Sequence, residues 1–162
     1  PGEYLEVEIT ENLLLSETAS VVEKMRALRN RGVRIAIDDF GTRYSSLNYL
    51  RNFPISAIKI DQSFVRDLSE KQGASPIISA IVGIARGFGL HLVAEGVETA
   101  YHLEVLHNLG CEEMQGYLFS RPVPADEVID LLATMANHPV EVSQAVEAPL
   151  LFVDAFDMKG MQ

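Results

Sequence analysis

The sequence predicts an α/β protein built on a parallel sheet, and three observations support this fold class. Short apolar runs rich in β-branched residues alternate with longer segments of helical period, which is the order of βαβ units. The connections between them are short, which favours parallel strands joined by right-handed crossovers. A polar residue also lies at or beside the C-terminal end of each predicted strand, namely Glu8, Asp38, Lys59, Glu95 and Gln115. In a (β/α) barrel the carboxyl ends of all strands meet at one mouth. The alternative, a doubly wound open sheet, would spread those residues along an edge.

The first half of the chain contains three of the predicted strands. The run "YLEVEI" (4–9) is typical of a strand, and the segment 16–32 has helical spacing, with Ser16 as a candidate N-cap. The runs "VRIAI" (33–37) and "AIKI" (57–60) are apolar and β-branched, which predicts two further strands.

The second half continues the alternation of helices and strands. Helices are predicted at 75–89, 100–110 and 124–137, and strands at "LHLVAE" (90–95) and "CEEMQ" (111–115). Pro76 suits the first turn of its helix, and Gly89 and Gly110 are typical residues for helix ends. These segments complete about five βα units.

The number of units falls short of a complete barrel, which has eight units and roughly 250 residues. We therefore expect residues 1–137 to form the C-terminal part of an incomplete barrel that lacks the N-terminal strands. Two open sheet edges would follow, so pairing with a second copy as a homodimer, or a rearranged sheet, is predicted. The tail 138–162 contains the apolar run "PLLFVDAF", which predicts docking on a core surface or an open edge, with disorder as the alternative.

The composition narrows the possible partners. The chain of 162 residues carries 23 Asp and Glu against 13 Lys and Arg, a net charge of -10, and has no basic run, which argues against a nucleic-acid partner. No stretch approaches the ~20 apolar residues that span a bilayer, and the N-terminus does not resemble a signal peptide, so we expect a cytoplasmic segment without membrane contact. Cys111 is the only cysteine, which excludes an internal disulfide and predicts a small buried residue.

Two adjacent carboxylates, Asp38 and Asp39, follow the second predicted strand. Neighbouring strand residues point to opposite faces, so both can reach one ligand only if the strand ends there and Gly41 turns the backbone. Two crowded carboxylates either raise a pKa or bind a cation. Together with Glu8 and Glu95 at neighbouring strand ends, they predict a site for a hard divalent ion.

The alternative for this pair is a cap. Asp39 or Thr42 could cap a helix beginning near Ser45. Lys59, in "AIKID", also has two interpretations: a structural counter-ion for these acids, or a group that orients an attacking water and stabilises charge on a phosphate oxygen. Glu98, three residues after Glu95, is either a loop-fixing acceptor or a partner of the metal site.

Read in order, four stretches resemble the EAL domain, the cyclic di-GMP phosphodiesterase family of bacteria. They are "EVEITEN", "IAIDDFGTRYSSLNYLRNFPISAIKIDQSFV", "LVAEGVET" and "QGYLFSRPVP", and together they cover roughly residues 5–124. The resemblance implies a TIM-like barrel that uses Mg²⁺ or Mn²⁺, commonly two ions, to hydrolyse cyclic di-GMP to linear pGpG.

The resemblance also implies roles for individual residues. Glu8, Asp38 and Asp39 would be metal ligands, Glu11 would anchor the loop after Asp39, Lys59 would position the attacking water, and Glu95 would act as general base or hold a water on the metal. Glu98 and Gln115 would belong to the surroundings of metal and substrate. The loop after the acids contains Gly41, Thr42, Arg43, Ser45 and Ser46, and Arg43 stands where the family's usual "DFGTGYSSL" has a second glycine.

The resemblance has one consequence for the chain taken alone. The Glu-Ala-Leu signature and the family's Asn ligand do not occur in these 162 residues, so we expect the isolated chain to be inactive and to bind metal poorly. The parent protein is expected to be the phosphodiesterase, with a diguanylate cyclase-like, PAS or receiver domain upstream and possible anchoring through upstream segments. The alternative is a degenerate EAL module that binds cyclic di-GMP or a partner protein without hydrolysis.

Overall fold

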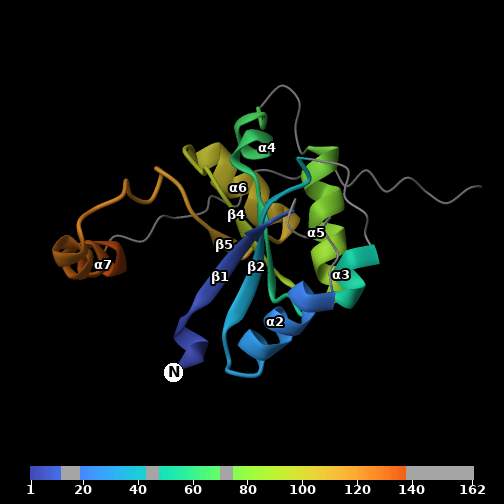
Figure 1. Ribbon diagram of the computed structural model, residues 1–162. Coiled ribbons are helices and arrows are strands. Elements are labelled where there is room, and N and C mark those ends of the chain that lie inside the picture. Colours follow the sequence, from blue (N-terminus) through green and yellow to red (C-terminus); the bar gives the residue numbers. More distant parts are fainter. Residues whose placement is uncertain (12–18, 43–47, 70–74, 138–162) are drawn as a thin grey trace, which may run out of the picture.

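A parallel sheet of five strands forms the centre of the molecule in the computed structural model, which describes residues 1–11, 19–42, 48–69 and 75–137 (Figure 1). The strands are β1 (Glu6–Thr10), β2 (Arg34–Phe40), β3 (Ala57–Ile60), β4 (His91–Ala94) and β5 (Glu113–Met114). Every neighbouring pair is parallel, and the spatial order β1-β2-β3-β4-β5 follows the sequence. A doubly wound sheet reverses its strand order at a switch point, so this order agrees with a barrel segment instead.

Helices cover the sheet and follow the strands in alternation. They are α2 (Ala19–Arg29), α3 (Asn48–Asn52), α4 (Gln62–Arg66), α5 (Pro76–Phe88), α6 (Ala100–Leu109) and α7 (Val128–Asn137), with short 3-10 turns η1 (Gly2–Tyr4) and η2 (Ala125–Glu127). Helix α2 contacts β2, and α5 contacts β3 and β4. All four residues of β3 are buried, which agrees with its place in the middle of the sheet between β2 and β4.

The helix boundaries predicted at Pro76, Gly89 and Gly110 are confirmed. Pro76 opens α5, where its missing N–H costs no helical hydrogen bond. Gly89 ends α5 with a φ of 65°, and Gly110 ends α6 with a φ of 85°. In each case the glycine amide donates back to carbonyls of the last helical turn, a left-handed cap that a residue with a Cβ adopts only at a cost.

The structure corrects two predicted element boundaries and adds one helix. The helix predicted at 124–137 begins at Val128, after the short turn η2. Strand β2 continues through both aspartates to Phe40, whereas the sequence predicted an end at Ile37. The short helix α4 was not predicted. Asp61 caps it by accepting a hydrogen bond from the Ser63 amide at 3.0 Å, so a local side-chain cap outweighs the weak helical period of this segment.

Cys111 is buried, as predicted, with 1% of its surface exposed. Its Sγ lies 3.3 Å from the carbonyl oxygen of Glu113, and burial raises the thiol pKa to about 11. A thiol with this pKa is neutral and unreactive near neutral pH.

Other predictions lie outside the described residues: the Ser16 cap, the loop positions Arg43, Ser45 and Ser46, and the tail 138–162. Within the described ranges, β1 and β5 form the two edges of the sheet. Helix α7 lies apart from the sheet in Figure 1. None of the helices in these described ranges has the length and apolarity needed to cross a bilayer.

Candidate metal and catalytic site

The backbone at Asp39 explains how two adjacent aspartates reach the same side of the sheet. The register between β2 and β3 shifts between Ile37 and Phe40, and Asp39 has a φ of 54°, in the left-handed region. Aspartate tolerates this conformation better than most residues. The turn predicted at Gly41 therefore begins at Asp39, inside the strand, and Gly41 continues it with a φ of 92°.

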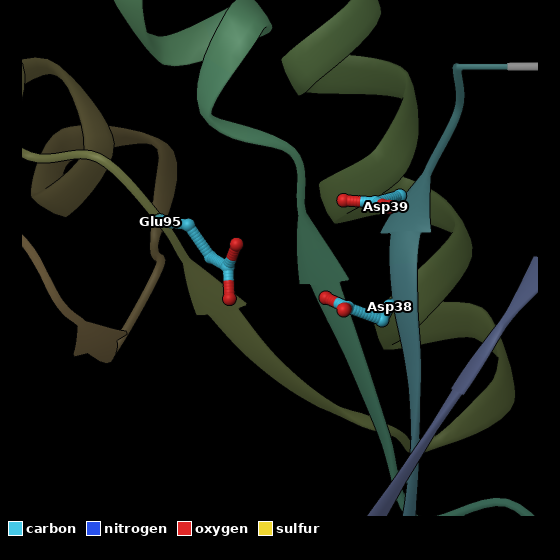
Figure 2. A group of neighbouring side chains, drawn as sticks. All are labelled: Asp38, Asp39 and Glu95. Carbon is cyan, nitrogen blue, oxygen red and sulfur yellow. The ribbon is translucent and has the colours of Figure 1, made fainter.

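Three carboxylates meet above the end of β3. Figure 2 shows Asp38 and Asp39 projecting from β2 toward Glu95, which directly follows β4. One oxygen atom from each of the three residues lies within 4.8 Å of the other two. Since β2 and β4 flank β3, the parallel register brings both strand ends to the same rim.

Lys59 lies at the centre of these acids, in β3. Its Nζ atom is 2.6 Å from Glu95 Oε1, 2.5 Å from Glu8 Oε1 and 3.5 Å from Asp38 Oδ1. Only 7% of the Lys59 side chain is exposed. Burial opposes its charged form, but the hydrogen bonds to Glu8 and Glu95 outweigh burial and hold the Lys59 pKa above its ordinary value. Lys59 is therefore a charged counter-ion in this structure.

Loss of solvation is the largest cause of the raised pKa values of Glu95 and Asp39. Burial raises the pKa of Glu95, and the nearby charges of Asp38 and Glu8 act in the same direction against the attraction of Lys59. Asp39 is exposed, but partial desolvation raises its pKa, and the charge of Asp38 and a contact with Asp61, to which protonated Asp39 can donate, act in the same direction. These acids are therefore poised to accept a proton or a cation.

Of the remaining residues predicted for the site, Gln115 and Glu8 contact it, whereas Glu98 is paired elsewhere. Gln115 reaches the site, because its Nε2 donates to Glu95 Oε1 at 2.9 Å. Glu8 joins it through Lys59 and is not part of the three-acid group. Glu11 is buried just after β1, with 3% exposed. Glu98 instead lies 3.7 Å from Arg66 Nη2 on α4.

The helix start near Ser45, which Asp39 or Thr42 was predicted to cap, lies outside the described residues, and the structure describes only the turn that precedes it. The Thr42 hydroxyl donates to the Asp39 carbonyl oxygen at 2.9 Å, which closes the turn, and the Asp39 carboxyl bonds to Asp61. The cap itself stays a prediction.

The donor set fits a hard divalent cation. All candidate ligand atoms are carboxylate oxygens, which Mg²⁺ and Mn²⁺ prefer. Asp38 Oδ1 is buried and accepts no hydrogen bond, and its contact with Lys59 is long at 3.5 Å. A buried carboxylate oxygen without a hydrogen-bond donor is costly, and a cation would satisfy it.

Gly116 determines how closely the Gln115 loop approaches the Glu95 loop. A Cβ at Gly116 would lie 2.3 Å from both the nitrogen and the oxygen of Val97. We expect Gly116→Ala to lower the free energy of unfolding by about 2–3 kcal/mol, because the backbone must move to relieve the overlap. Urea denaturation measures this change. Gly83→Ala is the matched control, since a Cβ there meets no atom within 4 Å. Equal stability of the two variants would contradict the close approach.

The sequence did not predict the contacts that two residues, Asp61 and His102, make near the site. Asp61 contacts Asp39, and His102 contacts the backbone of the Glu95 loop. Both had a local signal, because Asp61 precedes Ser63 at cap spacing and His102 follows Thr99 by three, the spacing of a capping box.

Comparison with known proteins identifies the class of this domain. Residues 1–122 match the family model of the EAL domain, and the chain belongs to this family. It is 46% identical over 121 residues to cyclic di-GMP phosphodiesterase NbdA of Pseudomonas aeruginosa. The matched region covers 75% of this chain and 16% of NbdA. The chain spans 16% to 22% of the length of the curated relatives it matches.

Solved structures agree with this assignment. The PaMucR phosphodiesterase in complex with c-di-GMP is 41% identical with a TM-score of 0.72, over 78% of this chain and 51% of that one. A manganese and cy-diGMP complex of BlrP1 from Klebsiella pneumoniae is 36% identical with a TM-score of 0.66, over 75% of this chain and 31% of that one. These neighbours confirm the fold expected from the sequence.

Proposed function

We propose that this chain carries part of the active site of a cyclic di-GMP phosphodiesterase that produces linear pGpG. One observation carries the proposal: in a chain of the EAL family, oxygens of Asp38, Asp39 and Glu95 lie within 4.8 Å of one another. The NbdA relative is named a cyclic di-GMP phosphodiesterase, and the BlrP1 neighbour was solved with manganese and the dinucleotide.

From the three-acid group, Asp38 and Asp39 are the proposed ligands of one or two Mg²⁺ or Mn²⁺ ions, and Glu8, which joins the group through Lys59, is the third proposed ligand. A divalent ion at these oxygens would supply charge to neutralise the phosphodiester and would activate water near neutral pH. It would also offset the net charge of -10, which otherwise repels an anionic dinucleotide.

Glu95 is suited to accept a proton from the attacking water. Lys59 and Gln115 both donate to its Oε1, at 2.6 and 2.9 Å, which fixes the carboxylate and leaves Oε2 as the oxygen that can take the proton. Its raised pKa, caused first by burial, makes Glu95 a stronger base than an exposed glutamate. Lys59 would orient the same water and stabilise negative charge on the phosphate.

The assay that tests this proposal compares the full-length parent protein with the isolated chain. With Mn²⁺ present, we expect the parent to convert cyclic di-GMP to pGpG and the 162-residue chain alone to produce none, because the family's signature Glu and its Asn ligand do not occur in these residues. Chromatography of the nucleotides measures both reactions. A parent that forms no pGpG would overturn the proposal, and turnover by the chain alone would show that these five strands suffice.

A degenerate EAL module is the second candidate. It would bind cyclic di-GMP or a partner protein without cleaving the nucleotide. The retention of Glu8, Asp38, Asp39, Lys59 and Glu95 favours the enzyme. Calorimetric binding of intact cyclic di-GMP by the parent, without pGpG formation over hours, would favour the module instead.

The oligomeric state, the upstream domains and the location of the parent protein also stay predictions. A homodimer is one way to cover the open edges β1 and β5. An upstream diguanylate cyclase-like, PAS or receiver domain would couple a signal to the site. A cytoplasmic location is the setting in which we expect this domain to meet cyclic di-GMP.

A further inference from the structure

Two hydrogen bonds between side chains and backbone amides close the N-terminus of α6. The Thr99 hydroxyl accepts a hydrogen bond from the His102 amide at 3.1 Å, and His102 Nδ1 accepts one from the Glu98 amide at 3.3 Å. This arrangement resembles a capping box, in which the side chain three positions after a Ser or Thr cap accepts from the N–H of the cap, except that here it accepts from the N–H of Glu98, one residue before the Thr99 cap. The capping box normally uses Glu or Gln at the later position. Here the acceptor is an imidazole.

An imidazole accepts this bond in only one of its protonation states. Nδ1 has a lone pair when the ring is neutral with its proton on Nε2, and it loses that lone pair when the ring is protonated. His102 is buried, with 8% of its surface exposed, so little water is available to take over the Glu98 amide. The protonated ring would also place positive charge at the positive end of the α6 dipole.

The bond holds a segment that carries part of the candidate site. The segment 95–99 joins β4 to α6 and begins with Glu95. Two other backbone amides of the segment bind neighbouring parts of the chain: the Glu95 amide donates to the Ile60 carbonyl of β3 at 3.2 Å, and the Val97 amide donates to the carbonyl of Gln115, just after β5, at 3.1 Å. The His102 contact is therefore a third anchor for this segment, and it is the one that can ionise.

Burial and a neighbouring charge shift the pKa of His102 in opposite directions. Burial lowers the pKa of His102, and the nearby Glu98 carboxylate raises it to a smaller extent. Glu98 is itself paired with the Arg66 guanidinium of α4, at 3.7 Å. The ring is therefore neutral near neutral pH, which is the state that accepts the hydrogen bond.

We propose that His102 is a positioning residue that fixes the segment 95–99 when neutral and releases the Glu98 amide when protonated. Its consequence for hydrolysis, through Glu95, rests on the proposed function, but the local switch does not. Because the folded-state pKa lies below the ordinary 6.5, the unfolded chain binds the proton first. The stabilising effect of His102 is thus complete above 6.5 and is lost as the pH falls from there toward the folded-state pKa.

Amide NMR spectra of the nitrogen-15-labelled chain, recorded from about pH 8 to about pH 5, test the switch directly. We expect the Glu98 amide shift to follow the titration of the His102 ring. In His102→Gln, which keeps an acceptor but does not ionise in this range, the Glu98 amide should not titrate. In His102→Ala, hydrogen exchange at Glu98 should be about tenfold faster, the order expected for one lost hydrogen bond.

The exposed His107, on the same helix, provides the control. In His107→Gln the Glu98 amide should titrate as in the unaltered chain. A Glu98 amide that stays constant while the His102 ring titrates would overturn the proposal, as would an equal titration in His102→Gln. Neither result requires that His102→Ala folds.

The link to hydrolysis is measured separately, in the full-length protein. His102→Gln should remove the contribution of His102 to the acid limb of the pH–rate profile, with a larger change in kcat than in KM. A protein that forms no pGpG at any pH would contradict the proposed function alone, because the NMR titration does not depend on activity.

Discussion

Replacing Asp38 with asparagine in the full-length protein is expected to lower the rate of cyclic di-GMP hydrolysis by about 10³-fold or more. Asp38 belongs to the three-acid group, and its Oδ1 is buried without a hydrogen-bond donor. Asparagine has nearly the same shape but no charge, so the substitution removes an ionic ligand. A loss of about 4 kcal/mol of transition-state stabilisation corresponds to this rate change.

Two measurements test this prediction. Formation of pGpG gives the rate, and electron paramagnetic resonance of the free Mn²⁺ ion during a Mn²⁺ titration gives the metal affinity. We expect the apparent affinity for Mn²⁺ to fall along with the rate, while circular dichroism stays unchanged. Asp126→Asn, an exposed aspartate in η2, is the matched control and should retain full activity. Unchanged turnover in Asp38→Asn would exclude Asp38 as a metal ligand.

Replacing Lys59 with methionine is expected to destabilise the metal-free chain by on the order of 3 kcal/mol. Methionine preserves most of the side-chain length, but the ammonium that contacts Glu8, Asp38 and Glu95 is lost. Removing one partner from a buried ionic group leaves the other charges uncompensated. Glu8 is about half exposed, and water will screen its share of the effect.

Urea denaturation with and without Mn²⁺ measures the effect and also separates the two interpretations of Lys59. We expect Mn²⁺ to restore part of the lost stability, because a cation can replace the ammonium among the acids. If Lys59 were only a counter-ion, saturating Mn²⁺ would also restore hydrolysis in full-length Lys59→Met. If Lys59 orients water, as we propose, activity stays low while stability recovers.

Lys24→Met is the control for Lys59→Met, since Lys24 is exposed on α2. Its effect on unfolding should be within about 0.5 kcal/mol, the range typical of surface substitutions. A Lys59→Met variant that is as stable as this control, without metal, would show that the lysine does not neutralise the acids.

The parallel sheet was predictable because its signals are local. Each strand is a short apolar run, and residues such as Pro76, Gly89 and Gly110 determine where helices begin and end through their own backbone preferences. The short helix α4 was missed for a related reason: five residues give too little helical period, and only the Asp61 side chain specifies its start.

The acidic rim was also predictable, because parallel strands in sequential order bring their carboxyl ends together. The bulge at Asp39 was not. A residue with a φ of 54° inside a strand depends on the register between β2 and β3, and the simple alternation of side chains predicts the opposite orientation.

The sequence by itself determined the order of the elements, the parallel arrangement and the choice of acids, because each follows from local periodicity and chain order. Only the tertiary structure decided that Lys59 lies among Glu8, Asp38 and Glu95, that Gln115 supports Glu95, and that His102 holds the Glu98 amide. The physical reason is the short range of these interactions. Ion pairs and hydrogen bonds form over about 3 Å, and residues far apart in the chain reach that distance only after register and packing are established.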